Sequence, residues 1–138
     1  INEDPKKIKK IIPNLTNSIK KRKIFNVFGG NYSTKDGTCY RDYIHIDDLI
    51  DAHVSGLKYL NKRIYEVVNI GTGKCYSVKE LISTFSKILN YDIPYKIVGR
   101  RKGDIPVCYA SVKKSKKFLK WKTKKNILTM CRDIIKVI

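Results

Sequence analysis

The sequence predicts an α/β fold, because short β-prone runs alternate with amphipathic segments along the chain. Residues 64–70 and 94–98 are expected to form strands, since both runs are short and apolar. Ser77 and Glu80, three residues apart, match the pattern of a helix capping box. The apolar residues of the helix that would follow recur at helical spacing: Val78, Leu81, Ile82, Phe85 and Leu89.

Segments on either side extend this alternation. Residues 5–23 form a basic amphipathic segment, in which Pro13 predicts a break or kink. Residues 24–28 are expected to form a short strand, and residues 40–46 are β-prone as well. Residues 127–138 predict a final amphipathic helix.

Two more helices are expected from capping residues. Asp47 or Asp48 can cap a helix that runs to Leu60. Ser111 can cap a basic helix that runs to Leu119. The chain of 138 residues is long enough for one modest domain, but too short for a complete dinucleotide-binding enzyme with a substrate domain.

The composition is strongly basic, with 30 Lys and Arg against 12 Asp and Glu and a net charge of +18. Such a charge attracts polyanions without sequence preference, so a nucleic-acid or other polyanion-binding module is one alternative. We favour solvated lysine faces, because lysine runs lack interleaved aromatic side chains, and we expect no specific nucleic-acid partner.

The four cysteines form no C-x-x-C pair, so free thiols in a reducing, cytoplasmic compartment are expected. The two histidines match no common zinc spacing, and we expect no metal. No apolar run approaches the roughly 20 residues of a membrane span, and we expect no membrane association. The acidic start without Met is not a signal peptide, and suggests processing or a longer parent chain.

Two short motifs resemble cofactor or catalytic patterns. Gly71 and Gly73 lie between a predicted strand and a predicted helix, but Tyr76 occupies the third glycine position of a dinucleotide fingerprint. We interpret the pair as a tight turn. Tyr109 and Lys113 have the Tyr-x-x-x-Lys spacing of a dehydrogenase base, which we attribute to chance in a chain rich in both residues.

A third pattern predicts an anion site. Arg41 in one loop and Arg100 with Arg101 in another can supply guanidinium groups, which bind phosphate oxygens in a bidentate manner. Asp104 can accept from a vicinal diol, so the set suits a diphosphate with a ribose. From spacing alone, ordinary surface ion pairs Arg41–Asp42 and Arg101–Asp104 explain the pattern better.

Several segments, in order and spacing, resemble UDP-glucose 4-epimerases of the extended short-chain dehydrogenase class. They are Phe28-Gly29, the run DGT-x-x-RDYIH-x-x-DL from Asp36 to Leu49, Ile70-Gly-Thr-Gly73, and Arg100-Arg-x-Gly-Asp104. The resemblance implies a C-terminal, substrate-binding α/β portion of such an enzyme, spanning residues 1–138 and lacking most of the Rossmann domain.

By position, the resemblance implies a role for each matching residue. Asn26 and Phe28 would contact the uracil, largely through backbone groups. Arg41 and Arg101 would hold the diphosphate, and Asp104 would accept from ribose hydroxyls. The chain departs from the family at residue 10, where lysine stands in place of an asparagine that helps bind the nucleotide.

Cys108 occupies a position where some members have a large Tyr beside the sugar, so acceptance of N-acetylated UDP-sugars is a hypothesis. The resemblance implies an NAD-dependent isomerase of galactose metabolism that interconverts UDP-glucose and UDP-galactose, homodimeric at full length. NAD and the catalytic Tyr, Ser and Lys would belong to a preceding domain, so this chain alone is expected to be inactive. A non-catalytic pseudoenzyme domain is a further alternative.

Overall fold

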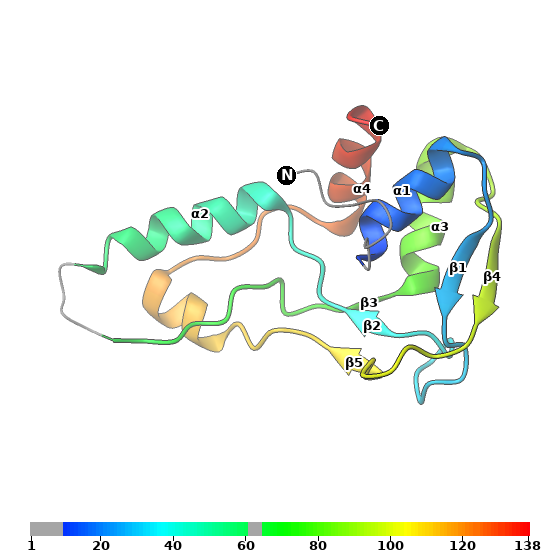
Figure 1. The fold of residues 1–138 in the computed structure, drawn as a ribbon. Helices are drawn as coiled ribbons and strands as arrows, with labels where there is room; N and C mark the ends of the chain where they lie inside the picture. The colour runs from blue at the N-terminus through cyan, green and yellow to red at the C-terminus, as the bar shows by residue number, and fades with distance from the viewer. Residues whose placement is uncertain (1–9, 61–64) are drawn as a thin grey trace.

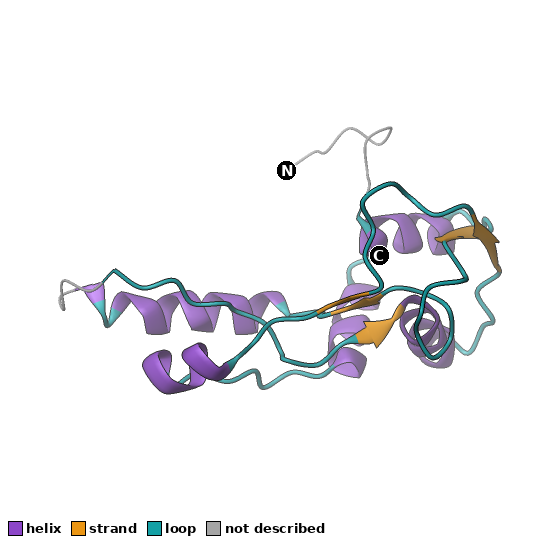
Figure 2. Ribbon diagram, turned by 90° about the horizontal axis from the view of Figure 1, so that it is seen from below, coloured by secondary structure: helices purple, strands orange, loops and turns teal. Residues whose placement is uncertain are grey.

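The computed structural model describes residues 10–60 and 65–138. In chain order its elements are α1 (Ile11–Lys20), β1 (Phe25–Phe28), β2 (Tyr40–Arg41), α2 (Ile46–Leu57), β3 (Tyr76–Ser77), α3 (Val78–Leu89), β4 (Tyr95–Val98), β5 (Val107–Cys108), the π-helical segment η2 (Ser115–Leu119) and α4 (Ile127–Lys136). Figure 1 shows a body that contains α1, α3, α4, β1 and β4, and an arm that contains α2 and η2. Figure 2 shows the same separation from below.

The core of the body lies against α3. This helix fully buries Leu81 and Phe85, and β1 buries the alternate residues Phe25 and Val27. Leu15 of α1 joins the same cluster. Because a helix buries positions three or four apart and a strand every second one, the two apolar faces meet in a single core. The α/β fold class is confirmed.

The predicted capping box and the strand near residue 94 are both confirmed. The Ser77 hydroxyl accepts from the Glu80 N–H at 2.9 Å, and the Glu80 carboxylate accepts from the Ser77 N–H at 2.7 Å. The strand β4 pairs in parallel with β1, with Phe25 opposite Tyr95. The connection between the two strands contains α3, as parallel pairing requires a long crossover.

The expected helix over residues 5–23 is shorter within the described part, where α1 begins at Ile11. Residues 5–9 lie outside the described part. Pro13 does not break the helix, because it lies in the first turn, where backbone N–H groups have no intrahelical acceptor. The predicted strand at 64–70 is wrong for residues 65–70, which form no ladder with any other described segment.

Three other local predictions also need correction. The N-cap of α2 is His45, whose Nδ1 accepts from the Asp47 N–H at 3.0 Å, and the helix ends at Leu57. Ser111 caps no helix, because the helical turn that leads into η2 begins two residues later, at Lys113. The β-prone run at 40–46 forms a strand only at its first two residues, Tyr40–Arg41.

Asp42 directly follows the strand β2, and its side chain connects this end of the strand to other segments. Its carboxylate accepts from the Thr72 N–H at 3.0 Å, the Gly73 N–H at 3.0 Å and the Ala110 N–H at 3.2 Å, and also from the Thr72 hydroxyl. A Cβ on Gly71 would lie 2.7 Å from a carboxylate oxygen of Asp42. One side chain therefore ties together β2, the turn before β3 and the segment after β5.

The turn at Asp36 holds the loop before β2 in place. The Asp36 carboxylate accepts from the Thr38 N–H at 2.9 Å and from the Ser77 hydroxyl. Burial alone raises the pKa of Asp36, but the hydrogen bonds from Ser77 and Thr38 outweigh it, so the net pKa is lowered. Gly37 has φ +79°, and a Cβ there would lie 2.2 Å from the Gly30 carbonyl oxygen, so only glycine fits.

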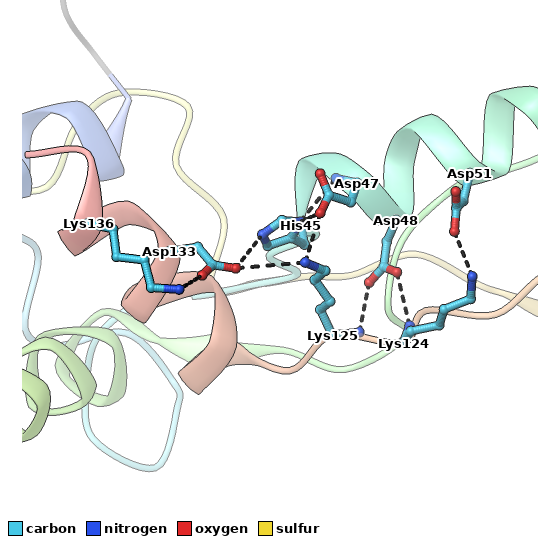
Figure 3. Close-up of polar contacts among 8 residues, drawn as sticks. All are labelled: His45, Asp47, Asp48, Asp51, Lys124, Lys125, Asp133 and Lys136. Carbon is cyan, nitrogen blue, oxygen red and sulfur yellow. Dashed lines mark hydrogen bonds and ion pairs between the residues drawn. The ribbon is translucent and has the colours of Figure 1, made fainter.

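Arm and body are joined by polar contacts at the start of α2 (Figure 3). The Asp48 carboxylate is 1% exposed and accepts from the backbone N–H groups of Lys124 at 3.1 Å and Lys125 at 3.0 Å. The Nε2 atom of His45 lies 3.3 Å from the carboxylate of Asp133 on α4. These contacts fix α2 relative to α4.

We predict that Asp42→Ala lowers the free energy of unfolding by about 2–3 kcal/mol, because it leaves partly buried backbone N–H groups without an acceptor. Urea denaturation of the whole chain measures this. The matched control is Asp51→Ala, which removes an exposed carboxylate paired with Lys124 and should cost under about 0.5 kcal/mol. Equal losses in the two variants would contradict the linking role of Asp42.

Candidate functional site

A cavity of about 300 Å³ opens between α1, β1 and the loop before β5. Three groups of residues line it: Asn14, Asn17 and Ser18 from α1, the strand β1, and Arg101 with Asp104 from the loop. Polar side chains and backbone therefore surround a space of the size that holds a small ring compound.

One backbone edge of β1 is open toward this cavity. The N–H groups of Phe25 and Gly29 donate to the carbonyls of Pro94 and Val98, both at 2.9 Å, so they point to β4. Because successive residues of a strand direct their N–H and C=O groups to opposite edges, Asn26 and Phe28 direct theirs away from β4. Among the described residues, no strand pairs with this edge, so its main-chain donors and acceptors are available along one wall of the cavity.

Two arginines converge on Asp104. The Nε atom of Arg101 lies 2.9 Å from its carboxylate, and an Nη atom of Arg41 lies 3.7 Å from it. Arg41 also donates to the carbonyl of Ile105 at 2.8 Å, and the Arg101 guanidinium lies 4.8 Å from the centre of the Phe28 ring. The two positive groups are therefore held close together, in a position where they can bind an anion.

Cys108 completes the set of residues expected from the sequence. It lies on β5 directly opposite Arg41 of β2, and its side chain is exposed. Asn26, Phe28, Arg101 and Asp104 line the cavity, while Arg41 and Cys108 lie on the adjacent strand pair. Four of the six therefore share the cavity, and Arg41 is connected to it through Asp104.

Of the two surface ion pairs that spacing alone suggested, the structure shows Arg101–Asp104. Arg101 does pair with Asp104, three residues away. Arg41, in contrast, pairs with Asp104 across the fold, whereas its neighbour Asp42 accepts from the Gly71–Gly73 turn. Asp104 is therefore shared by both arginines, an arrangement that spacing in the sequence does not show.

Arg100 has a different role from its neighbour Arg101. Its Nε atom donates to the Asn31 side chain at 2.7 Å, another nitrogen donates to the Asn31 carbonyl, and its guanidinium lies 4.2 Å from the centre of the Tyr32 ring. Burial raises the pKa of Tyr32, so this hydroxyl stays protonated. Arg100 thus fastens the loop after β1, and only Arg101 turns to the cavity.

Sequence reasoning did not identify the three polar residues of α1 that line the cavity. Asn14, Asn17 and Ser18 are three and four positions apart, so they share one helix face. The signal was present, because the apolar positions of this helix leave that face polar. The sequence does not show that this polar face lies next to β1, where the two elements line one cavity.

A family model for the NAD dependent epimerase/dehydratase family matches residues 2–71, which is half of the chain. The chain belongs to this family. A UDP-glucose 4-epimerase from Bacillus subtilis is 41% identical over 136 residues, covering 96% of this chain but 40% of the relative. This chain of the epimerase/dehydratase family therefore spans about two fifths of that relative's length.

Solved structures agree with this assignment. A UDP-glucose 4-epimerase from Stenotrophomonas maltophila, crystallised with NAD and formylated UDP-arabinopyranose, matches with a TM-score of 0.90 and 37% identity over 99% of this chain and 41% of that one. The enzyme from Bifidobacterium longum, in complex with NAD+ and UDP, matches with a TM-score of 0.88 and 39% identity over 98% of this chain and 41% of that one. The resemblance to epimerases is confirmed.

Neither of the two short motifs forms a cofactor or catalytic site in the described structure of this family member. The N–H groups of Thr72 and Gly73, which a glycine-rich loop would direct at a phosphate, already donate to Asp42. Tyr109 precedes the helical turn that begins at Lys113, so the two do not share a helix face. Both motifs are therefore coincidental, as expected.

Within residues 10–60 and 65–138, no group of three or more His, Cys, Asp or Glu side chains could hold a metal ion. The described part of the chain contains no helix long and apolar enough to span a bilayer.

We predict that Arg100→Ala speeds amide hydrogen exchange at Tyr32 by about three- to tenfold, because the loop loses charge-assisted hydrogen bonds. Mass spectrometry with peptide resolution would measure this, and amides of α3 should exchange as before. Lys102→Ala, in the same exposed loop, is the control and should leave the exchange unchanged. Unaltered exchange in Arg100→Ala would show that Arg100 does not fasten the loop.

Proposed function

We propose that residues 1–138 form the UDP-sugar-binding domain of an NAD-dependent UDP-glucose 4-epimerase, which interconverts UDP-glucose and UDP-galactose. The observation that carries this proposal is that the open edge of β1, Arg101 and Asp104 line one cavity, with Arg41 paired to Asp104 beside it. The epimerase activity of the relatives and the UDP compounds bound in the two solved structures support it.

The base of the nucleotide would bind along β1. A pyrimidine edge carries hydrogen-bond donors and acceptors side by side, which suits the outward N–H and C=O groups of Asn26 and Phe28. The Phe28 ring, beneath Arg101, adds an apolar surface for the nucleotide.

The diphosphate would bind to Arg101 and Arg41. Both now contact Asp104, and a diphosphate carries more negative charge than this single carboxylate. Binding would draw the two guanidinium groups to the phosphate oxygens and release Asp104 to accept from the ribose hydroxyls. The same three residues thus serve as a preformed anion site and a ribose contact.

Catalysis would need a second domain. NAD, when bound there, supplies the hydride chemistry at the sugar, and this chain supplies tight binding of the nucleotide. The exposed apolar stripe of α2, formed by Ile46, Ile50, Val54 and Leu57, and the unpaired segment 65–70 offer a surface for that domain. The chain alone is therefore expected to bind without turnover. The homodimer and the cytoplasmic location of the longer protein stay predictions.

We predict that Arg101→Ala weakens UDP binding by about ten- to a hundredfold, as loss of charge-assisted hydrogen bonds implies. Isothermal titration calorimetry with the whole chain would measure this. Lys102→Ala and the double variant Lys116→Ala/Lys117→Ala are controls for charge and should bind UDP as before. The opposite pattern, with a steep salt dependence, would instead favour polyanion binding.

We also predict that Cys108→Tyr weakens binding of UDP-N-acetylglucosamine more than binding of UDP-glucose. A large ring beside Arg41 would occupy space that the smaller thiol leaves open for the N-acetyl group. The measured quantity is the ratio of the two dissociation constants, which should change at least about fivefold. An unchanged ratio would contradict a role of Cys108 in sugar selection.

A further inference from the structure

The polar face of α1 forms the wall of the cavity that faces the open edge of β1. Asn17 and Ser18 belong to this wall, together with Asn14. Within the described part of the chain, no hydrogen bond engages the Asn17 amide or the Ser18 hydroxyl. Two residues with unused side-chain hydrogen-bonding groups therefore line the same cavity as Asn26.

A single N–H and C=O pair of the backbone edge does not distinguish the two pyrimidines. A neighbouring N–H and C=O on a strand edge can pair with N3–H and a carbonyl oxygen of uracil. The same two groups can pair with N3 and the amino group of cytosine, since these also present one acceptor and one donor side by side. A third hydrogen-bonding group beside this pair can distinguish the two bases.

Beyond the paired donor and acceptor, each base has one more carbonyl oxygen, and its place relative to that pair differs between uracil and cytosine. In uracil the remaining carbonyl oxygen follows the donor of the pair, whereas in cytosine it follows the acceptor. A donor fixed at one end of the strand edge therefore contacts an oxygen in one base and misses it in the other. An amide NH2 and a hydroxyl, both held on a helix, can be such donors.

We propose that Asn17 and Ser18 of α1 determine which base the site accepts, and that they select uracil over cytosine. This inference rests on the proposed nucleotide-binding function. It assigns α1 a specificity role that is separate from the affinity supplied by the arginines. The helix is anchored for this role, because its Leu15 side chain is completely buried in the core.

The test compares dissociation constants for UDP and CDP, measured by calorimetry on the whole chain. The unchanged protein should bind UDP more tightly, and Asn17→Ala/Ser18→Ala should reduce the ratio by about tenfold, mostly through weaker UDP binding. Ser18→Thr keeps a hydroxyl and should keep most of the preference when introduced alone. Lys20→Ala, at the exposed end of α1, is the control and should not change the ratio.

The outcomes separate the two proposals. UDP binding with an unchanged ratio in the double alanine variant, or no preference in the unchanged protein, would overturn the role of α1 and leave the nucleotide site intact. Absence of UDP binding by the unchanged protein would overturn the proposed function and this inference with it. Thermal unfolding of each variant checks that a reduced ratio does not follow from loss of structure.

Discussion

The carboxylate of Asp42 is the contact on which the site depends. It accepts from the turn at Thr72 and Gly73 and from Ala110, and so holds three chain segments that are distant in sequence. These are the segments that flank β2, β3 and β5. Because Arg41 directly precedes Asp42, this contact also fixes the base of the arginine that reaches Asp104. A charged acceptor that satisfies several backbone donors stabilises a junction where strands only two residues long could not.

The cavity itself is a composite of a helix, a strand and a loop. The strand β1 contributes main-chain groups because β4 covers only one of its edges. The loop contributes Arg101 and Asp104, while Arg100 fastens the neighbouring loop through Asn31. Arg100 and Arg101 have different roles, because the Arg100 guanidinium is hydrogen-bonded to Asn31 while Arg101 lines the cavity. The charge that remains near the cavity is concentrated on Arg41 and Arg101.

The arm has the opposite character. Apolar side chains of α2 stay exposed along one face, and segment 65–70 lies without strand partners among the described residues. Body and arm are nevertheless joined firmly, because Asp48 and His45 bond to the segment around Lys125 and to α4 (Figure 3). The arm therefore presents its apolar face in a fixed orientation, which is what a surface for a second domain requires.

Elements whose signals are local could be predicted from the amino-acid sequence. The sequence predicts the capping box at Ser77 and Glu80 and the strand β4 correctly, because both depend on neighbouring residues. The family motifs are likewise short runs of neighbouring residues. The motif from Asp36 to Leu49 also identified the family, although most of its residues hold the fold and only Arg41 reaches the site. The remaining features depend on how distant segments of the chain pack together. The run at 65–70 has strand propensity but no partner, and a strand needs a neighbour to satisfy its backbone. The sharing of Asp104 by two arginines, and the position of Asn17 and Ser18 beside β1, arise only when segments far apart in the chain pack together.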